Sequence, residues 1–334
     1  MGVINMDPCT AGADLTSIWD SNLHASYVAG AGRNGGGALR LTGGTGTANA
    51  TKSIVAISEC WRHFALSFSS TPGSDQEIMQ ILDSGNAQIR LRLLTNLSLQ
   101  FVVGSTLVGS PTTLLLSPGV KYRFALHLLV SATSGLAELR LNGSPSTLLT
   151  FSGNTKATSN STFNQLAFHG PSSVNFDFSD IYDLDNSGSP TGFQGDQFIG
   201  EATLTGDSAT SGKNQFATTP AQTTGNHHLN VIDGSDLTFN SDATVGDVER
   251  YRFSLPSSIA PTVLAALVKG NIDTAGSKSI GVGFSSGGVD SLGSDFSLPS
   301  SPGWAPLVAL ANDPSTSAPW GSNPSAEVLV KVTA

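Results

Sequence analysis

Apolar and polar residues alternate strictly along much of this chain, and helical periodicity is almost absent. The longest run spans residues 122–130, where every second side chain is apolar and Arg123 and His127 stand between. Shorter runs with the same spacing lie at 64–68, 89–93 and 139–141. Because successive side chains of a strand point to opposite faces, this pattern predicts strands with one buried face and one wet face.

Clusters of Gly, Pro, Asn and Ser separate these segments, as at 71–74, 117–119 and 142–145. Such clusters are turn signals, since Gly supplies positive φ and Pro pre-sets the turn. Many short strands with regular turns favour a sandwich of two sheets. We therefore expect an all-β chain.

The 334 residues are enough for two domains. Residues 174–199 read as a last strand, a short acidic run, a Gly/Ser/Pro turn and a new apolar start at Phe193. We expect a β-sandwich over 1–189 and a second, smaller β-rich domain over 190–334. The strands predicted in the second domain are 198–204, 228–232, 248–255, 262–269, 278–284 and 326–332. Residues 259–268 fit a short helix equally well.

Composition bounds the possible partners. Charged residues make up 12% of the chain, about half the usual share of roughly 25%. A weakly charged, Gly-, Ser- and Thr-rich surface is typical of extracellular β proteins and virion components, and it favours permanent neighbours. The net charge of −9 and the scattered Lys and Arg residues argue against nucleic-acid binding. No stretch approaches the ~20 apolar residues of a membrane span, and the first residues do not read as a secretory signal.

Six short sequence motifs follow one another along the chain. They are DLTSIW at 14–19, GRNGGGALRL at 32–41, SPGVKY at 117–122, LRLNG at 139–143, FSDIYDLDNSGSPTGFQGD at 178–196 and DPSTSAPW at 313–320. The residues of these motifs and their order resemble those of tailed-bacteriophage virion structural proteins of the minor-tail or decoration type. Those proteins carry a laminin-G-like, concanavalin A-like jelly-roll domain. The chain departs from this pattern at Phe216, where relatives often have Trp, and at His227–His228, where a His-Tyr pair is common.

The resemblance implies an all-β jelly-roll sandwich, followed by a C-terminal β-rich domain for virion assembly. It implies a structural component of a tailed-phage virion, assembled in the host cytoplasm in several symmetric copies. We expect a tail or adsorption protein that packs against other virion subunits, with host glycan as a further contact. A capsid decoration protein is the alternative, and a glycan-binding module or depolymerase ranks lower.

No catalytic constellation stands out, so we expect a chain that is not an enzyme and needs no cofactor. Glucanases of this shape carry an E-x-D-x-x-E strand, which is missing here. The six histidines lack the H-x-x-x-H spacing of a zinc helix, and His63, His127 and His169 are expected on the polar faces of strands.

A calcium site is the weak candidate among metals. Oxygen-bearing side chains occupy the first, third and fifth positions of an EF-hand-like loop motif, as Asp183, Asp185 and Ser187. Position twelve is Gln194, where a bidentate Glu is needed, so a turn made by Asp and Asn side chains is the preferred interpretation.

Tryptophans are the candidates for contact surfaces. Trp304 and Trp320 lie in Pro-rich loops and are predicted to face a neighbouring subunit, whereas Trp61 precedes an alternating strand and is predicted in the core. The sequence leaves open whether Cys9 and Cys60 form a disulfide or stay free and buried.

Overall fold

The structure is a computed structural model, and it describes residues 2–10, 14–42, 48–171, 174–188, 190–223, 225–232, 237–255, 260–272, 277–322 and 324–334. The chain forms two compact units, Met1–Ile199 and Gly200–Ala334. The boundary predicted at residue 189 lies outside the described residues, and the observed division follows Ile199.

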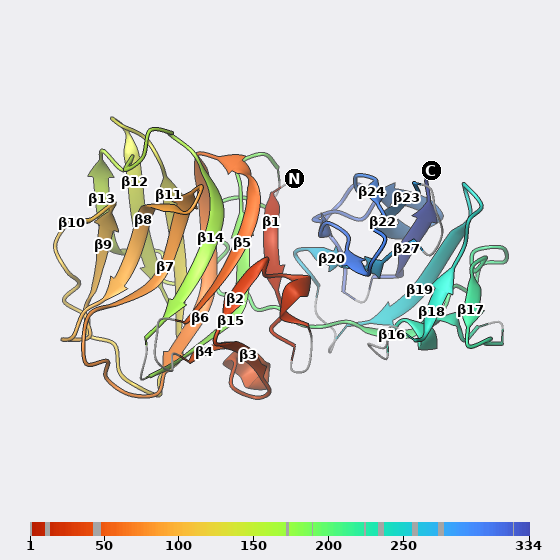
Figure 1. The fold of residues 1–334 in the computed structure, drawn as a ribbon, viewed down its shortest axis with the longest axis horizontal. Helices are drawn as coiled ribbons and strands as arrows, with labels where there is room; N and C mark the ends of the chain where they lie inside the picture. Colours follow the sequence, from red (N-terminus) through yellow and green to blue (C-terminus); the bar gives the residue numbers. More distant parts are fainter. Residues whose placement is uncertain are drawn as a thin grey trace. The chain divides into compact units, whose positions relative to one another are not determined.

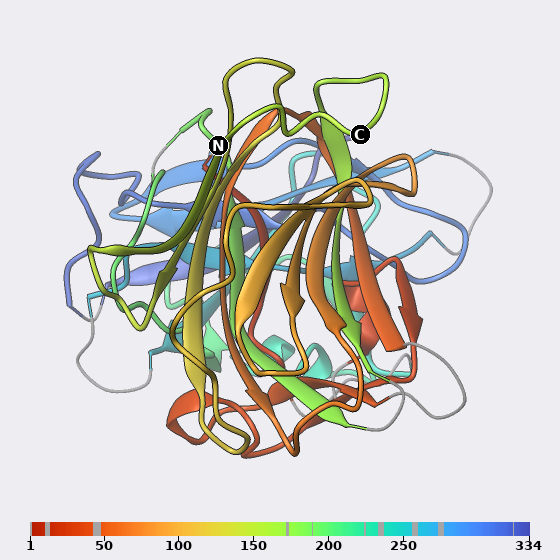
Figure 2. The ribbon, with the colours of Figure 1, turned by 90° about the vertical axis from the view of Figure 1, so that its left-hand side faces the viewer.

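Two antiparallel sheets face each other in the first unit (Figures 1 and 2). In hydrogen-bonded order, the larger sheet contains β13 (Thr147–Gly153), β12 (Gly135–Leu141), β11 (Tyr122–Leu129), β6 (Glu59–Phe68), β15 (Asn175–Leu184), β4 (Ala38–Thr42) and β3 (Ala25–Val28), while β1 (Val3–Asp7) also pairs with β15. The second sheet contains β10 (Thr106–Val108), β9 (Leu99–Val103), β8 (Asn86–Leu93), β7 (Gln76–Asp83), β14 (Phe163–Gly170), β5 (Ala48–Ile57) and β2 (Ser21–Leu23). Two short 3-10 helices, η1 (Leu15–Ser17) and η2 (Arg33–Gly35), lie in the loops.

Aromatic rings from both sheets form the core of the sandwich. Phe64 and Phe124 are directly paired across β6 and β11, with ring centroids 5.0 Å apart. Phe168 of the opposite sheet packs edge-on against Phe64 at 5.0 Å and lies 4.4 Å from Phe178. All four rings are fully buried, as the alternating pattern predicts for the inward face of each strand.

The second unit is built on one antiparallel sheet. Its strands, in order, are β16 (Thr203–Asp207), β19 (Val248–Ser254), β27 (Ala326–Val332), β22 (Ser279–Ser286) and β23 (Val289–Leu292), and β24 (Phe296–Ser297) also pairs with β22. Three two-stranded ribbons accompany it: β17 (Ala217–Thr219) with β18 (Phe239–Ser241), β20 (Leu264–Ala266) with β26 (Val308–Leu310), and β21 (Lys269–Gly270) with β25 (Gly303–Trp304). The described residues of this unit also contain the 3-10 helix η3 (His227–Asn230).

The prediction of an all-β chain, a two-sheet sandwich followed by a smaller β-rich unit, is confirmed. One local prediction in the second unit is wrong, and one open alternative is decided. Residues 227–230 form η3 and not a strand, because the carboxylate of Asp207 binds the first backbone N–H groups of this turn. The helix considered over 259–268 is a strand at Leu264–Ala266, where pairing with β26 satisfies the backbone; residue 259 lies outside the described residues.

Trp320, predicted to face a neighbouring subunit, is instead buried in the core of the second unit. Its side chain is 3% exposed, its Nε1 donates to the carbonyl of Leu310 at 2.9 Å, and its ring packs against Phe284. The loop sequence around it is polar, but the ring is large enough to reach the sheet and close the core. The prediction of a surface role for Trp320 is therefore corrected.

The structure also bears on the predictions for Trp61, for the two cysteines and for membrane spans. Trp61 lies within β6 and is half-buried, with its ring stacked on His127 at 4.5 Å, so the predicted core position is only partly reached. Cys9 and Cys60 are both free and buried. Among the helices of the described residues, none is long and apolar enough to cross a membrane.

Candidate functional site

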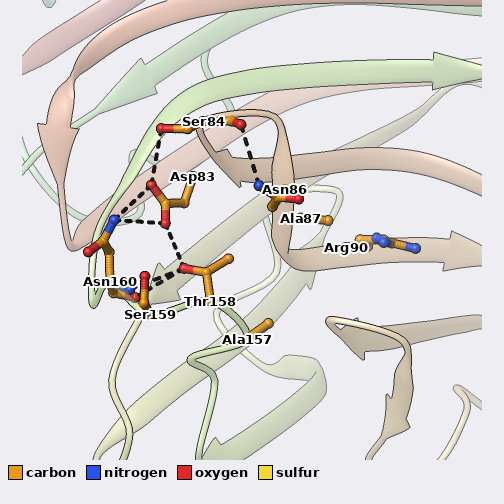
Figure 3. Close-up of a pocket in the computed structure, with 9 residues that line it drawn as sticks. All are labelled: Asp83, Ser84, Asn86, Ala87, Arg90, Ala157, Thr158, Ser159 and Asn160. Carbon is orange, nitrogen blue, oxygen red and sulfur yellow. Dashed lines mark hydrogen bonds between the residues drawn. The ribbon is translucent and has the colours of Figure 1, made fainter.

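An open pocket of about 620 Å³ lies at one end of the sandwich, between the β7–β8 turn and the loop that joins β13 to β14 (Figure 3). The turn is tight because Ser84 and Gly85 both adopt positive φ. The loop is rich in Asn, Ser and Thr, which satisfy backbone groups locally and need no regular structure. The pocket is lined by Asp83, Ser84, Asn86, Ala87, Arg90, Ala157, Thr158, Ser159 and Asn160.

Gln88 holds this loop in place. It is a fully buried polar residue of β8. Its Oε1 accepts from the backbone N–H groups of Ala157 and Thr158, at 2.7 and 3.2 Å. Its Nε2 donates to the Thr158 hydroxyl at 2.7 Å and to the carbonyls of Asn160 and Thr162. One side chain therefore satisfies several loop groups and positions the pocket wall.

Asp83 is the acidic residue that lines the pocket. Its carboxylate accepts from the Thr158 hydroxyl at 2.7 Å and from the Asn160 amide at 3.0 Å, as Figure 3 shows. These hydrogen bonds, led by that of Thr158, lower the pKa of Asp83 below its usual value, with Asn160 and Ser84 adding to the effect. The pocket therefore offers an ionised acceptor among neutral hydroxyl and amide groups.

Arg90 borders the pocket, but its guanidinium extends away from Asp83 (Figure 3). Its Nη1 pairs with Glu77 at 2.6 Å, and Arg92 reaches the same carboxylate at 3.4 Å. Glu77 therefore partly neutralises both cations. Close to Asp83, the donors available to a ligand are hydroxyl and amide groups.

Sequence reasoning missed this pocket. The signals were present: residues 154–162 read NTKATSNST, and Gln88 is a polar residue of a strand whose alternate positions are apolar. Neither signal indicates which distant turn the loop meets. The contact between residues 83 and 158–160 exists only because β7 and β14 are neighbours in the sheet.

The calcium candidates are engaged in other contacts. The carboxylate of Asp183 lies 2.9 Å from Nε of Arg62, and both side chains are completely buried. Asn5 donates to Asp183 as well, at 3.0 Å. The carboxylate of Asp185 accepts from the backbone N–H and hydroxyl of Ser187, at 3.0 and 2.8 Å. The structure thus gives Asp183 an ion pair in the interior and gives Asp185 and Ser187 a local turn.

Trp304, the other interface candidate, is half-buried in β25. The ammonium of Lys269 lies 6.0 Å from the centre of its ring, at the outer limit of a cation–π contact. The ring is therefore partly covered by its own unit. The predicted contact of Trp304 with a neighbouring subunit stays a prediction.

A second group of ionisable side chains lies within the second unit. Asp207 ends β16, His227 and His228 begin η3, and Glu249 lies in β19. Nδ1 of His227 lies 2.9 Å from Oε1 of Glu249, and Nδ1 of His228 lies 3.0 Å from Oδ1 of Asp207. Burial raises the pKa of Glu249 to about 7. Asp207, His227 and Glu249 each offer one ligand atom, and these atoms lie within 4.8 Å of one another.

The segment that follows this group exposes large apolar side chains. We call it the apolar segment and define it by Leu229, Val231, Ile232, Leu237 and Phe239, which are between 44% and 83% exposed. Its two described parts are linked, since the Asn230 amide donates to the carbonyl of Phe239 at 3.4 Å. Single exposed apolar residues are ordinary, whereas here five large ones fall within eleven positions.

Comparisons with known proteins give matches among solved structures alone. No protein-family model and no curated protein matches it. Similar solved structures include one titled "Sialidase", at 14% identity and a TM-score of 0.42, covering 56% of this chain and 19% of that one. Another is Trypanosoma rangeli sialidase in complex with sialic acid, at 15% identity and a TM-score of 0.39, covering 55% and 30%. A third is lectin UEA-II complexed with galactose, at 10% identity and a TM-score of 0.34, covering 44% and 86%.

The expectation that the chain is not an enzyme is corrected by these comparisons, because sialidases, which are enzymes, stand among the similar structures. The chain spans less than a third of the length of those sialidases. The likeness assigns no activity to this chain, because the identities are 15% or lower and the TM-scores are 0.42 or lower.

Proposed function

We propose that this protein is a subunit of a tailed-phage virion, most closely tail- or adsorption-associated, that packs against neighbouring subunits through its second unit. The observation that carries the proposal is the apolar segment, Leu229, Val231, Ile232, Leu237 and Phe239, which is exposed on the single chain. Covering a large apolar side chain contributes on the order of 1–2 kcal/mol. Five such side chains supply a substantial part of a specific interface.

Two sequence features support the proposal. The six sequence motifs that resemble those of tailed-phage virion proteins lie in both units, between residues 14 and 320. The low content of charged residues, 12%, reduces the desolvation cost of burying surface against a permanent neighbour.

Labelling of intact particles tests the placement. Immunogold labelling with antibodies against this chain is expected on the tail. Label on the capsid would favour the decoration alternative, and label on neither part of the particle would contradict the proposal.

Substitution of the apolar segment tests the interface itself. Leu237→Ser with Phe239→Ser is expected to leave the chain folded, because both side chains are exposed, and to lower its incorporation into particles at least about tenfold. The matched control is Val55→Ser, an 86% exposed apolar residue of β5, which is expected to be incorporated normally. Equal incorporation of both variants would contradict the proposed surface.

A second candidate function is glycan binding by the sandwich, and the pocket at Asp83 favours it. Sugar hydroxyls need donors and acceptors at fixed positions, and here an ionised carboxylate, two amides and several hydroxyls converge on an open depression. The Gln88 contacts pre-organise the loop that carries Thr158 and Asn160, which reduces the entropy lost on binding. In this function the pocket would hold a neutral, hydroxyl-rich host glycan.

Binding to an array of bacterial surface glycans tests this second function. Asp83→Asn removes the charged acceptor at nearly constant shape and is expected to weaken binding about tenfold or more. Asp75→Asn is the control, because Asp75 is an exposed turn aspartate outside the pocket. Release of reducing sugar from a bound glycan would identify a depolymerase, and an absence of binding across the array would remove this candidate.

A further inference from the structure

Two carboxyl groups are buried side by side in the second unit, each in contact with an imidazole. The side chains of Asp207 and Glu249 are both 0% exposed. Within the described residues, the ion pair of Asp207 is with His228 and that of Glu249 is with His227. A buried carboxylate is stable when a cation compensates its charge, and a neutral imidazole provides only a hydrogen bond.

Backbone groups hold both carboxylates in position. The N–H groups of His227 and His228 donate to the two oxygens of Asp207 at 2.8 and 2.7 Å. The N–H of Phe216 donates to Oε2 of Glu249 at 3.0 Å, which leaves Oε1 directed at His227. Such contacts to the far side of a ligand orient the ligand atom and are typical of metal centres.

The geometry points to a binding site for a divalent transition-metal ion of the zinc type, formed by Asp207, His227 and Glu249. One ligand atom from each residue lies within 4.8 Å of the other two. Zinc bonds to nitrogen and carboxylate oxygen are about 2.0–2.2 Å long, and tetrahedral ligands therefore lie roughly 3.4 Å apart. The widest separation must close by up to about 1.4 Å, and the His227–Glu249 pair, at 2.9 Å, must open by about 0.5 Å; both shifts are within reach of small side-chain rotations.

The donor set selects the class of metal. One imidazole with two carboxylates suits zinc and its neighbours in the first transition series, whereas calcium and magnesium prefer oxygen donors throughout. An ion at this position replaces the hydrogen bond between His227 and Glu249 and favours the ionised form of both buried carboxyl groups. Its fourth position would be open to water, because His227 is partly exposed.

The site joins three separate parts of the second unit. Asp207 comes from the end of β16, His227 from η3 and Glu249 from the start of β19. The apolar segment begins two residues after His227. A bound ion would therefore hold the start of the apolar segment against the main sheet. This effect does not depend on which molecule the apolar segment contacts.

Zinc binding by the untagged full-length chain tests the inference. The protein is stripped with EDTA, passed over a desalting column and incubated with Zn²⁺. The expected results are about one ion per chain by mass spectrometry of the eluted protein and a raised melting temperature. Co²⁺ in place of Zn²⁺ is expected to give visible absorption bands of a four- or five-coordinate site.

Conservative variants locate the ion. His227→Gln and Glu249→Gln are expected to weaken zinc affinity at least about 100-fold, and circular dichroism shows whether each variant is folded. The matched control is His127→Gln, which removes the imidazole of another His–Glu pair, in the first unit, 2.7 Å from Glu59. If the wild-type chain binds no zinc, or if His127→Gln loses the ion as His227→Gln does, the inference is overturned.

Discussion

Arg33 donates from Nε to Oδ2 of Asp180 at 2.9 Å, and this contact joins two sequence motifs, 32–41 and 178–196, that are far apart in the chain. Asp180 lies at an irregularity of β15, between Ser179 and Tyr182, where its φ is +50°. Its other oxygen accepts from the backbone N–H of Ile199 at 3.0 Å. Arg33 also pairs with Asp196 at 2.5 Å. Residues 32–41 and 178–196 thus meet in one network that holds the last residues of the sandwich.

Asp180→Asn is expected to lower the free energy of unfolding of the sandwich by about 1–3 kcal/mol. Asn tolerates positive φ, so the change isolates the charged hydrogen bonds to Arg33. The measurement is denaturant-dependent hydrogen exchange of amides in β6 and β15. Asp196→Asn is the control, because Asp196 is 63% exposed and its pair with Arg33 contributes about 1 kcal/mol or less. Equal losses in the two variants would contradict the special role of Asp180.

Asp183→Asn is expected to destabilise the sandwich more strongly, by about 3–5 kcal/mol. The change leaves the guanidinium of Arg62 buried without its ion-pair partner. Asp185→Asn is expected to cost about 1 kcal/mol or less, because its contacts with Ser187 are local to one turn and involve no ion pair among the described residues. Thermal unfolding measures both, and addition of Ca²⁺ is expected to leave the melting temperature unchanged. A rise of several degrees with Ca²⁺ would restore the calcium interpretation of Asp183, Asp185 and Ser187.

His63 is expected to make the sandwich sensitive to acid. It was predicted on a polar face, but it is fully buried beside Arg123, and its ring stacks on Tyr182 at 4.5 Å with Phe193 edge-on. Burial, followed by the charge of Arg123, lowers the pKa of His63 well below its usual 6.5. The imidazole of His63 therefore binds a proton more readily in the unfolded chain than in the folded chain. The free energy of unfolding falls as the pH drops below about 6.5.

The variant His63→Phe tests this pH dependence, since it keeps a ring against Tyr182 and removes the titration. The loss of melting temperature between about pH 7.5 and pH 5.5 is expected to be smaller than in the wild type. His24→Asn, at an exposed position with positive φ, serves as the control for removing a histidine. An unchanged acid sensitivity in His63→Phe would show that other groups are responsible.

Gln88→Ala is expected to release the loop over the pocket without unfolding the sheets. The amides of Ala157 and Thr158 lose their acceptor, so their hydrogen exchange should accelerate by about tenfold or more. Gln100→Ala on the adjacent strand is the matched control, because its amide binds Gly109 and does not touch this loop. Comparable acceleration in the control would mean that the loop responds to the sheet as a whole.

Local patterns carried the prediction of the fold, because strand formation depends on which face of each segment is apolar. The runs at 122–130 and 64–68 became β11 and β6, with Phe64 and Phe124 on the inward face. Prediction failed where a distant partner decided the outcome. Residues 228–232 alternate like a strand, but Asp207 binds the first N–H groups of this stretch and favours a 3-10 turn.

The sequence by itself determined the all-β class, the division into a sandwich and a second β unit, and the aromatic core, since alternation and turn residues are properties of neighbouring positions. Only the tertiary structure decided the sites. Asp83 meets Asn160 because β7 and β14 are adjacent, and Asp207 meets Glu249 because β16 pairs with β19. Buried charges are governed by the partners that folding brings within a few ångströms, and those partners are separated in the sequence by tens of residues.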